Sequence, residues 1–240
     1  MTSREDVVQF KAAGSWRGLA DLASRIVADA EAKGGRSMAP VMGGGTRLML
    51  AFEHRISDDI DLFIYDVQWM GYLTPRLNDT FESEIDSYEE AASSLKLKLP
   101  TGEIDFIVAP SLLQLPTAQF PGVPFALDAV EEVLAKKLFY RGWALAARDL
   151  FDWRAVAEHF EPGHLACLLG PLLRGEKTTQ VANALQQLRT SSMAAQLWEG
   201  IRAPFKPELA DSVDWALGEL EAYARCAPAQ KVRPPASPKG

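Results

Sequence analysis

The segment from Asp59 to Tyr65 constrains the fold of this chain more than any other, because acidic and apolar residues alternate at its start. Side chains alternate between the two faces of a strand, so Asp59 and Asp61 point to one face while Ile60 and Leu62 point to the other. The apolar face predicts a strand buried against a core. The opposite face holds two like charges close together, an arrangement that a hard cation such as magnesium neutralises.

A glycine cluster shortly before this strand, Gly43-Gly44-Gly45-Thr46, predicts a sharp turn between a strand at 39–42 and a short helix at 46–52. Glycine at such a turn frees backbone N–H groups and lets a phosphate approach closely. A tight turn without any ligand explains the same residues. The lysine and glycine spacings of a Walker loop or of a dinucleotide-binding fingerprint are missing.

A third candidate carboxylate, Asp105, lies on a predicted strand at 104–108 that forms a hairpin with a strand at 95–99. Taken singly, the three aspartates have another explanation, as strand-end or hairpin-edge residues that meet solvent. Taken in order, the glycine turn, the helix, the paired aspartates and the third aspartate are typical of nucleotidyl transfer. In that reaction, carboxylate-bound metal ions activate an acceptor hydroxyl and neutralise the triphosphate as pyrophosphate leaves.

The chain changes character near residue 125, where short strand-like runs give way to helical spacing. We therefore predict an α/β (α+β) protein with a mixed sheet in a domain at 1–122, a helical domain at 123–226 and a disordered basic tail at 227–240. An acidic stretch at 75–88 is expected to be partly helical. Other helices are predicted at 18–33, 126–140, 148–160, 164–173, 178–188 and 207–224.

The composition is that of a soluble globular protein, with 48% hydrophobic and 24% charged residues in a chain of 240. The two cysteines, Cys167 and Cys226, are far apart in sequence and predict neither a disulfide framework nor a zinc site, which favours a reducing, cytoplasmic setting. We expect no signal peptide. No apolar run reaches the ~20 residues that a membrane-spanning helix needs.

A net charge of −7 argues against a protein that coats nucleic acid through bulk electrostatics. Basic residues do gather at 136–154, but acidic residues are interleaved with them. This segment is therefore either a local site for an RNA end or a solvated helical face with intrahelical ion pairs.

As a set, the motifs resemble those of the nucleotidyltransferases of the AbiEii/AbiGii toxin family, which belong to the DNA polymerase beta-like superfamily. The resemblance covers about residues 38–155. The motifs that carry it are Gly44-Gly45-Thr46, Arg55-Ile56-Ser57-Asp58-Asp59-Ile60-Asp61-Leu62, Asp105-Phe106, Ala135-Lys136-Lys137-Leu138 and Arg148-Asp149-Leu150-Phe151-Asp152.

The resemblance implies roles for individual residues. Asp59, Asp61 and Asp105 are expected to bind Mg²⁺ or Mn²⁺ and to be catalytic together with Lys137, which reaches the triphosphate. Helical spacing places Lys137 and Arg141 on one face, which favours Lys137 over Lys136. Arg55 and Ser57 either contact phosphate or fix the loop before the strand. The expected nucleotide-binding residues are Gly44, Gly45, Thr46, Arg55, Ser57, Lys137, Arg148 and Asp149.

The implied fold is a polymerase-beta-like nucleotidyltransferase domain followed by a helical domain. The implied function is transfer of a nucleoside monophosphate from a nucleoside triphosphate to an acceptor hydroxyl, by the toxin of a toxin-antitoxin or phage-defence system. The tRNA 3′ end is the expected acceptor, and a cognate antitoxin protein is the expected partner. Two alternatives are a transferase that modifies a protein or a small molecule, and a non-catalytic nucleotide-binding regulator.

Overall fold

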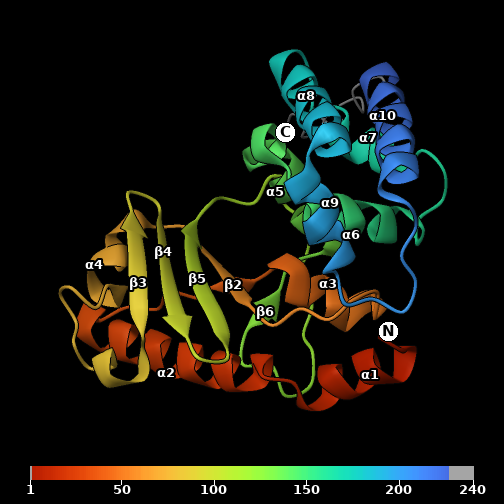
Figure 1. The fold of residues 1–240 in the computed structure, drawn as a ribbon. Coiled ribbons are helices and arrows are strands. Elements are labelled where there is room, and N and C mark those ends of the chain that lie inside the picture. Colours follow the sequence, from red (N-terminus) through yellow and green to blue (C-terminus); the bar gives the residue numbers. More distant parts are fainter. Residues whose placement is uncertain (1, 227–240) are drawn as a thin grey trace, which may run out of the picture.

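The computed structural model describes residues 2–226, so the tail predicted at 227–240 lies outside the described residues. Its strands are β1 (Val41–Met42), β2 (Ile60–Ile64), β3 (Ser87–Ala91), β4 (Ser94–Leu99), β5 (Gly102–Val108) and β6 (Ala126–Leu127). They form one six-stranded sheet in the order β3-β4-β5-β2-β1-β6 (Figure 1). β2 is parallel to β5 and β1 is parallel to β6, whereas the other neighbours are antiparallel. This mixed sheet confirms the predicted fold class.

Helices precede, cover and follow this sheet. In chain order they are α1 (Arg4–Ala13), α2 (Trp16–Gly34), α3 (Gly44–Phe52), α4 (Met70–Leu73), α5 (Val130–Tyr140), α6 (Ala147–Ala157), α7 (His164–Leu169), α8 (Glu176–Thr190), α9 (Ser192–Glu199) and α10 (Leu209–Arg225). In the part of the chain that the structure describes, no helix is both long and apolar enough to cross a membrane.

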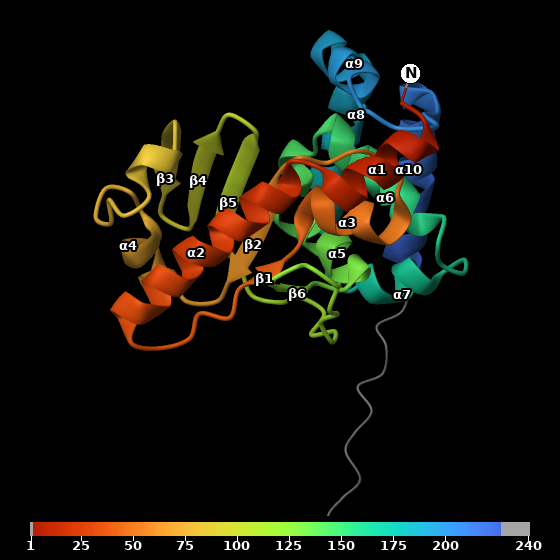
Figure 2. The same ribbon diagram turned by 90° about the horizontal axis from the view of Figure 1, so that it is seen from below.

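Helix α2 covers one face of the sheet (Figure 2). Its buried residues Leu19, Leu22 and Ile26 recur at helical spacing, which gives the helix one apolar side. This side packs against the apolar face of β2, where Ile60 and Leu62 are fully buried. The opposite face of β2 therefore remains for Asp61, as the alternation in the sequence predicts.

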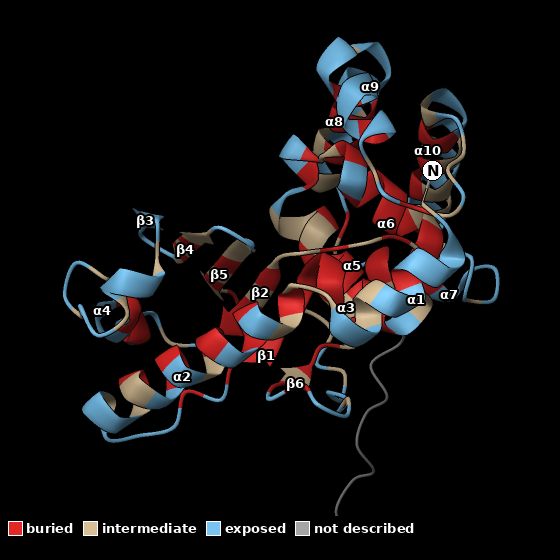
Figure 3. Ribbon diagram, turned by 60° about the horizontal axis from the view of Figure 1, so that its bottom comes forward, coloured by how far each residue is buried: buried red, intermediate tan, exposed pale blue. Residues whose placement is uncertain are grey.

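A second hydrophobic core lies among α5 to α10, which gather beside the sheet (Figures 1 and 3). Trp153 is fully buried there, and its indole N–H donates to the Tyr223 hydroxyl at 3.0 Å. Helix α3 connects the two cores, because Leu48 packs in the helical core while Met49 and Leu50 pack in the sheet core. Burying these apolar side chains on both sides of α3 fixes the glycine turn at its start between the two cores.

Some segments differ from the prediction. The acidic stretch at 75–88 contains only a single 3₁₀ turn, Glu82–Glu84, and its end belongs to β3. β3 is an exposed edge strand whose residues all face solvent, so it lacks the apolar alternation that identifies a strand in sequence (Figure 3). The helix predicted from Ala126 instead begins at Val130, because Ala126–Leu127 pairs with β1.

Helices α1 and α9 have no counterpart in the sequence predictions. Both are short, and each begins with a serine cap: the Ser3 hydroxyl accepts from the Asp6 N–H, and the Ser191 hydroxyl accepts from the Ala194 N–H. The two cysteines form no disulfide, although the fold brings the sulfur atoms of Cys167 and Cys226 to 3.1 Å.

Candidate active site

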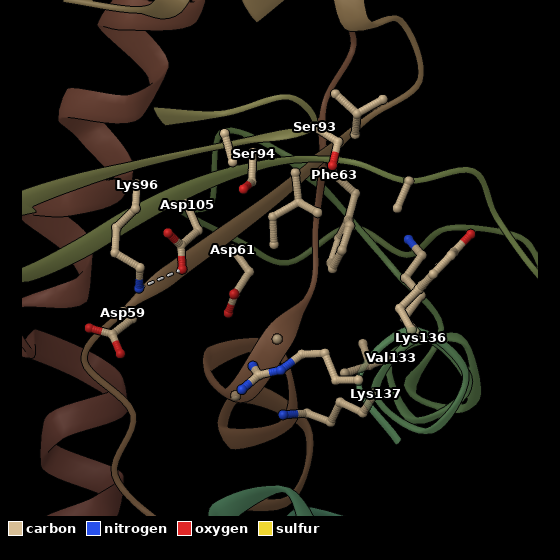
Figure 4. Close-up of a pocket in the computed structure, with 18 of the residues that line it drawn as sticks. Asp59, Asp61, Phe63, Ser93, Ser94, Lys96, Asp105, Val133, Lys136 and Lys137 are labelled. Carbon is tan, nitrogen blue, oxygen red and sulfur yellow. Dashed lines mark ion pairs between the residues drawn. The ribbon is translucent and has the colours of Figure 1, made fainter. Parts of the chain in front are cut away.

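A cavity of about 680 Å³ opens between the uncovered face of the sheet and helices α5 and α6 (Figure 4). Two of the predicted site residues, Thr46 and Asp149, are not part of its lining. All the others line it: Gly44, Gly45, Arg55, Ser57, Asp59, Asp61, Asp105, Lys137 and Arg148. The fold thus brings together residues that lie between positions 44 and 148 of the sequence.

The three aspartates share one wall of this cavity. Asp61 on β2 and Asp105 on β5 are direct cross-strand neighbours, so their side chains lie on the same face of the sheet. Asp59 immediately precedes β2, and one of its carboxylate oxygens accepts a hydrogen bond from the Glu103 N–H at 3.1 Å. The Arg148 guanidinium lies 3.6 Å from the other Asp59 oxygen.

The wall is short of positive charge. Burial, followed by the negative charge of Asp61, raises the pKa of Asp105 to about 6, although Lys96 acts in the opposite direction from 3.1 Å away. Burial also raises the pKa of Asp59, and Arg148 only partly offsets this effect. Like charges held together in a partly desolvated wall favour binding of a proton or a cation.

The donor chemistry of this wall fits a hard divalent cation, because carboxylate oxygens are the ligands that Mg²⁺ prefers. Within residues 2–226, however, no group of three or more Asp, Glu, His or Cys side chains is arranged to hold a metal ion. The ammonium group of Lys96 instead contacts Asp105 (Figure 4). The expected ligands therefore lie on one wall, with a lysine as the counter-ion of one of them.

The glycine turn packs so closely against neighbouring side chains that a Cβ would not fit at Gly44 or Gly45. Gly44 has a φ of +67°, a left-handed conformation, and a Cβ placed on it would lie 1.7 Å from a carboxylate oxygen of Asp61. A Cβ on Gly45 would lie 2.4 Å from the guanidinium of Arg55. Both glycines are in the first turn of α3, which begins at Gly44 rather than at Thr46. The close approach of Asp61 is a structural reason for glycine here, independent of any phosphate.

Thr46 is fully buried, and its hydroxyl lies 2.5 Å from the Asp59 carbonyl oxygen and 3.2 Å from that of Ser57. In this structure it therefore fixes the loop that carries Asp59 and does not face the cavity. Ser57 does line the cavity, with its backbone N–H 3.3 Å from the sulfur of Met49.

A buried network of charges supports the floor of the cavity. Arg55 donates two hydrogen bonds to Asp152, at 2.7 and 2.9 Å, and Lys137 lies 2.6 Å from Asp149 and 3.1 Å from Asp152. His54 adds a third contact to Asp152, at 2.7 Å. Burial disfavours the ionised form of Asp152, but Arg55 and Lys137 hold its pKa well below its usual range. Arg55 is thus a buried partner of Asp152 whose guanidinium also forms part of the cavity wall.

Lys137 faces the same network from α5. Burial opposes its charge, but Asp149 and Asp152 together raise its pKa, so it stays an ammonium ion at the cavity edge. Lys136 also lines the cavity, yet its ammonium group lies 2.7 Å from Asp128 and 3.8 Å from the centre of the Phe63 ring. The two lysines therefore have separate partners.

Three neighbours of the site were not among the predicted site residues. Asp152 lies one helical turn from Asp149, so both carboxylates meet Lys137, and the spacing of three within the motif could have indicated it. Lys96 is the direct cross-strand neighbour of Asp105 in the predicted hairpin. The register of that hairpin, counted outward from the turn, is the signal that could have found Lys96. Arg141 is half exposed and lies 3.8 Å from Asp149.

The arrangement of the sheet, the glycine turn and the carboxylate wall is the one that the sequence predicts for a nucleotidyltransferase. The chain matches the family described as "Nucleotidyl transferase AbiEii toxin, Type IV TA system" over residues 25–219. Because the match extends over most of the chain, the protein belongs to this family of nucleotidyltransferase toxins. The resemblance drawn from the motifs is confirmed.

Several solved structures are similar to this chain. A crystal structure of a candidate nucleotidyltransferase from H. pylori has 14% identity and a TM-score of 0.44, with 85% of this chain and 92% of that chain covered. JHP933 from Helicobacter pylori has 14% identity and a TM-score of 0.42, with coverages of 86% and 91%. The antibiotic-resistance factor ANT(2'')-Ia has 14% identity and a TM-score of 0.36, with coverages of 85% and 95%. No curated protein sequence matches the chain significantly.

Proposed function

We propose that this protein transfers a nucleoside monophosphate from a nucleoside triphosphate to an acceptor hydroxyl, in a reaction that depends on Mg²⁺ or Mn²⁺. The observation that carries the proposal is the position of Asp59, Asp61 and Asp105 on one wall of a cavity that Lys137 also lines. Anionic oxygens on one side and a cation on the other are the groups that a metal-bound triphosphate needs. Membership of the toxin family supports the same reaction class.

The three aspartates are the proposed metal ligands, and the metal would supply charge neutralisation at the phosphates. Lys137 would bind oxygens of the departing pyrophosphate, because Asp149 and Asp152 keep its ammonium group charged and fixed. Arg148, whose side chain is 53% exposed, is free to turn from Asp59 toward a phosphate. Gly44 and Gly45 would let the nucleotide approach the start of α3, where backbone N–H groups point outward.

The proposed acceptor is the 3′ end of tRNA, and the proposed partner is a cognate antitoxin of a toxin-antitoxin or phage-defence system in the cytoplasm. The family description supports the antitoxin, because it names a toxin-antitoxin (TA) system. The proposed division is a nucleotidyltransferase domain at 1–122 and a helical domain at 123–226. The separate sheet and helical cores support it, although β6 at Ala126–Leu127 still pairs with the sheet.

The test is to incubate the purified protein with Mg²⁺, each α-labelled nucleoside triphosphate in turn, and total cellular RNA and protein. We expect label on RNA of tRNA size. Asp61→Asn should lower this labelling by at least about 100-fold, because it removes a carboxylate charge that would hold the metal ion at the reacting phosphate. Asp79→Asn, an exposed aspartate away from the cavity, is the matched control and should label RNA as the wild type does.

Each outcome of this labelling experiment has a distinct meaning. Label on a protein band would replace tRNA by a protein acceptor. Full activity in the Asp61→Asn variant would contradict the assignment of the carboxylate wall. An absence of label with every acceptor, together with intact nucleotide binding, would point to a non-catalytic regulator.

A further inference from the structure

A second cavity, of about 480 Å³, lies on the far side of the loop that carries Asp59. It is separate from the 680 Å³ cavity of the candidate active site, which we call the nucleotide cavity. The two cavities share four lining residues: Arg55, Ser57, Asp59 and Arg148. Its remaining walls come from the start of α6, the end of α9 and the segment 200–202. Asp59 and Arg148 thus stand where the two cavities meet.

The segment at 200–202 is anchored to the loop before Asp59. The Ile56 N–H donates to the Arg202 carbonyl oxygen at 2.8 Å, and the Arg202 guanidinium forms an ion pair with Asp58. The helical part of the chain therefore reaches back and holds the loop whose end is Asp59. This contact forms one wall of the second cavity and fixes its position relative to the carboxylates.

The geometry of phosphoryl transfer suggests a role for this second cavity in binding the acceptor. The attacking oxygen and the leaving oxygen lie in line on opposite sides of the reacting phosphorus. With the nucleotide in the first cavity and pyrophosphate leaving toward Lys137, the acceptor hydroxyl has to arrive from the other side. The second cavity meets the first at Asp59, so an acceptor bound in it would lie beside one of the proposed metal ligands.

The lining of the second cavity indicates what kind of acceptor fits. Arg148 and Arg202 are about half exposed, and each has a single acidic partner for a guanidinium that carries five N–H donors. Guanidinium groups recognise phosphate through paired hydrogen bonds. The lining also includes the apolar side chains of Ile201 and of the exposed Leu197, against which a sugar or base can pack.

We propose that the second cavity is the acceptor site, and that it takes the hydroxyl end of a nucleic acid strand with Arg202 on one of its phosphates and Leu197 under its terminal nucleotide. This inference rests on the proposed nucleotidyltransferase function and adds to it the place and the chemistry of acceptor recognition. Arg202 and Leu197 are positioning residues for the acceptor and do not line the nucleotide cavity.

The test uses the full chain, bulk tRNA as the acceptor, and the labelled nucleotide that the wild type prefers. Arg202→Gln should raise the apparent KM for tRNA about 5- to 100-fold and leave the KM for the nucleotide within about twofold. Because one phosphate contact is lost, the slope of log KM for tRNA against log salt should fall by about 1. Leu197→Gln should also raise the KM for tRNA, with the salt slope unchanged.

Two further variants separate recognition from folding. Arg189→Gln removes another exposed arginine, which pairs with Asp214 outside both cavities, and should leave both KM values as they are. Asp58→Asn removes the ion pair of Arg202 but keeps its guanidinium. If Arg202 only held the loop, Asp58→Asn would impair transfer as Arg202→Gln does; under our proposal, the freed guanidinium keeps the KM for tRNA equal or lower.

The proposal is overturned if Arg202→Gln leaves the KM for tRNA unchanged, or raises both KM values equally, while the wild type labels RNA. It is also overturned if the wild type labels only protein. If the wild type transfers label to no acceptor, the proposed function itself fails and the acceptor site fails with it. These patterns are distinct, so failure of the acceptor site and failure of the nucleotidyltransferase function are told apart in one set of assays.

Discussion

At the scale of single residues, Gly44 ties the turn to the carboxylate wall. Gly44→Ala would force a left-handed φ on a residue with a Cβ and press that Cβ into the Asp61 carboxylate. We expect a loss of more than about 2 kcal/mol in the free energy of unfolding and a loss of labelling activity. Gly18→Ala in α2 is the matched control, because nothing lies within 4 Å of the added Cβ. That control should raise stability by up to about 1 kcal/mol in the same urea titration.

The raised pKa of Asp105 predicts a pH dependence of stability in metal-free buffer. Its folded-state pKa of about 6 exceeds its ordinary value of 3.8. Between these values the folded protein keeps a proton that the unfolded chain has released, so stability falls as the pH rises through this window. Above pH 6, we expect Asp105→Asn to unfold at a higher urea concentration than the wild type. Its free energy of unfolding should be larger by at most about 3 kcal/mol. The difference should shrink as the pH falls toward 4, and a constant difference would contradict the assignment.

At the scale of elements, α6 is held to α5 and to the loop before β2 by Asp152. Asp152→Asn would leave Arg55 and Lys137 buried with one carboxylate fewer between them. Removing one partner of a buried ionic network typically lowers stability by about 3–5 kcal/mol. Asp214→Asn, which breaks the exposed pair with Arg189, should cause no measurable loss in the same urea unfolding experiment. Equal stability of both variants would show that the buried network is dispensable.

Elements with a strong apolar period were predictable from the sequence, and elements defined by pairing were not. Helix α2 and the β4–β5 hairpin lie close to their predicted positions, because burial of one face produces the pattern that the sequence displays. The edge strand β3 buries neither face, so its sequence reads as acidic and irregular. Strand β6 consists of two residues whose state depends on the distant β1, which no local pattern records.

The same distinction applies to the site. The positions of Asp59 and Asp61 follow from strand alternation, and Asp105 follows from the hairpin. By contrast, the burial of Thr46 against the Ser57 carbonyl and the pairing of Arg55 with the Asp152 carboxylate depend on groups 11 and 97 residues away. Contacts of that kind are decided by tertiary packing, so the sequence could name these residues without giving their partners.

At the scale of the whole molecule, the nucleotide cavity lies between the two cores and is lined by residues from both. Asp61 and Asp105 come from the sheet, whereas Lys137 and Arg148 come from α5 and α6. A metal-bound nucleotide would contact both groups at once and would be released when either side unfolds. Ligand binding to the native state alone stabilises it by about 2.7 kcal/mol at a ligand concentration 100 times the Kd.

We therefore expect the nucleoside triphosphate and Mg²⁺ together to raise the Tm by more than the sum of their separate effects. In Asp61→Asn the metal-dependent part of this Tm shift should vanish, because the sheet has lost one of the proposed metal ligands. In Arg148→Gln the shift should shrink, because the helical side has lost a contact, whereas Arg189→Gln should behave as the wild type does. The Tm of the wild type and of the three variants is measured by thermal unfolding monitored by circular dichroism. If the Tm shift is of equal size without Mg²⁺, or if it persists in Asp61→Asn, the nucleotide binds without the carboxylate wall. The helices alone would then form the binding site, and the sheet would only support them.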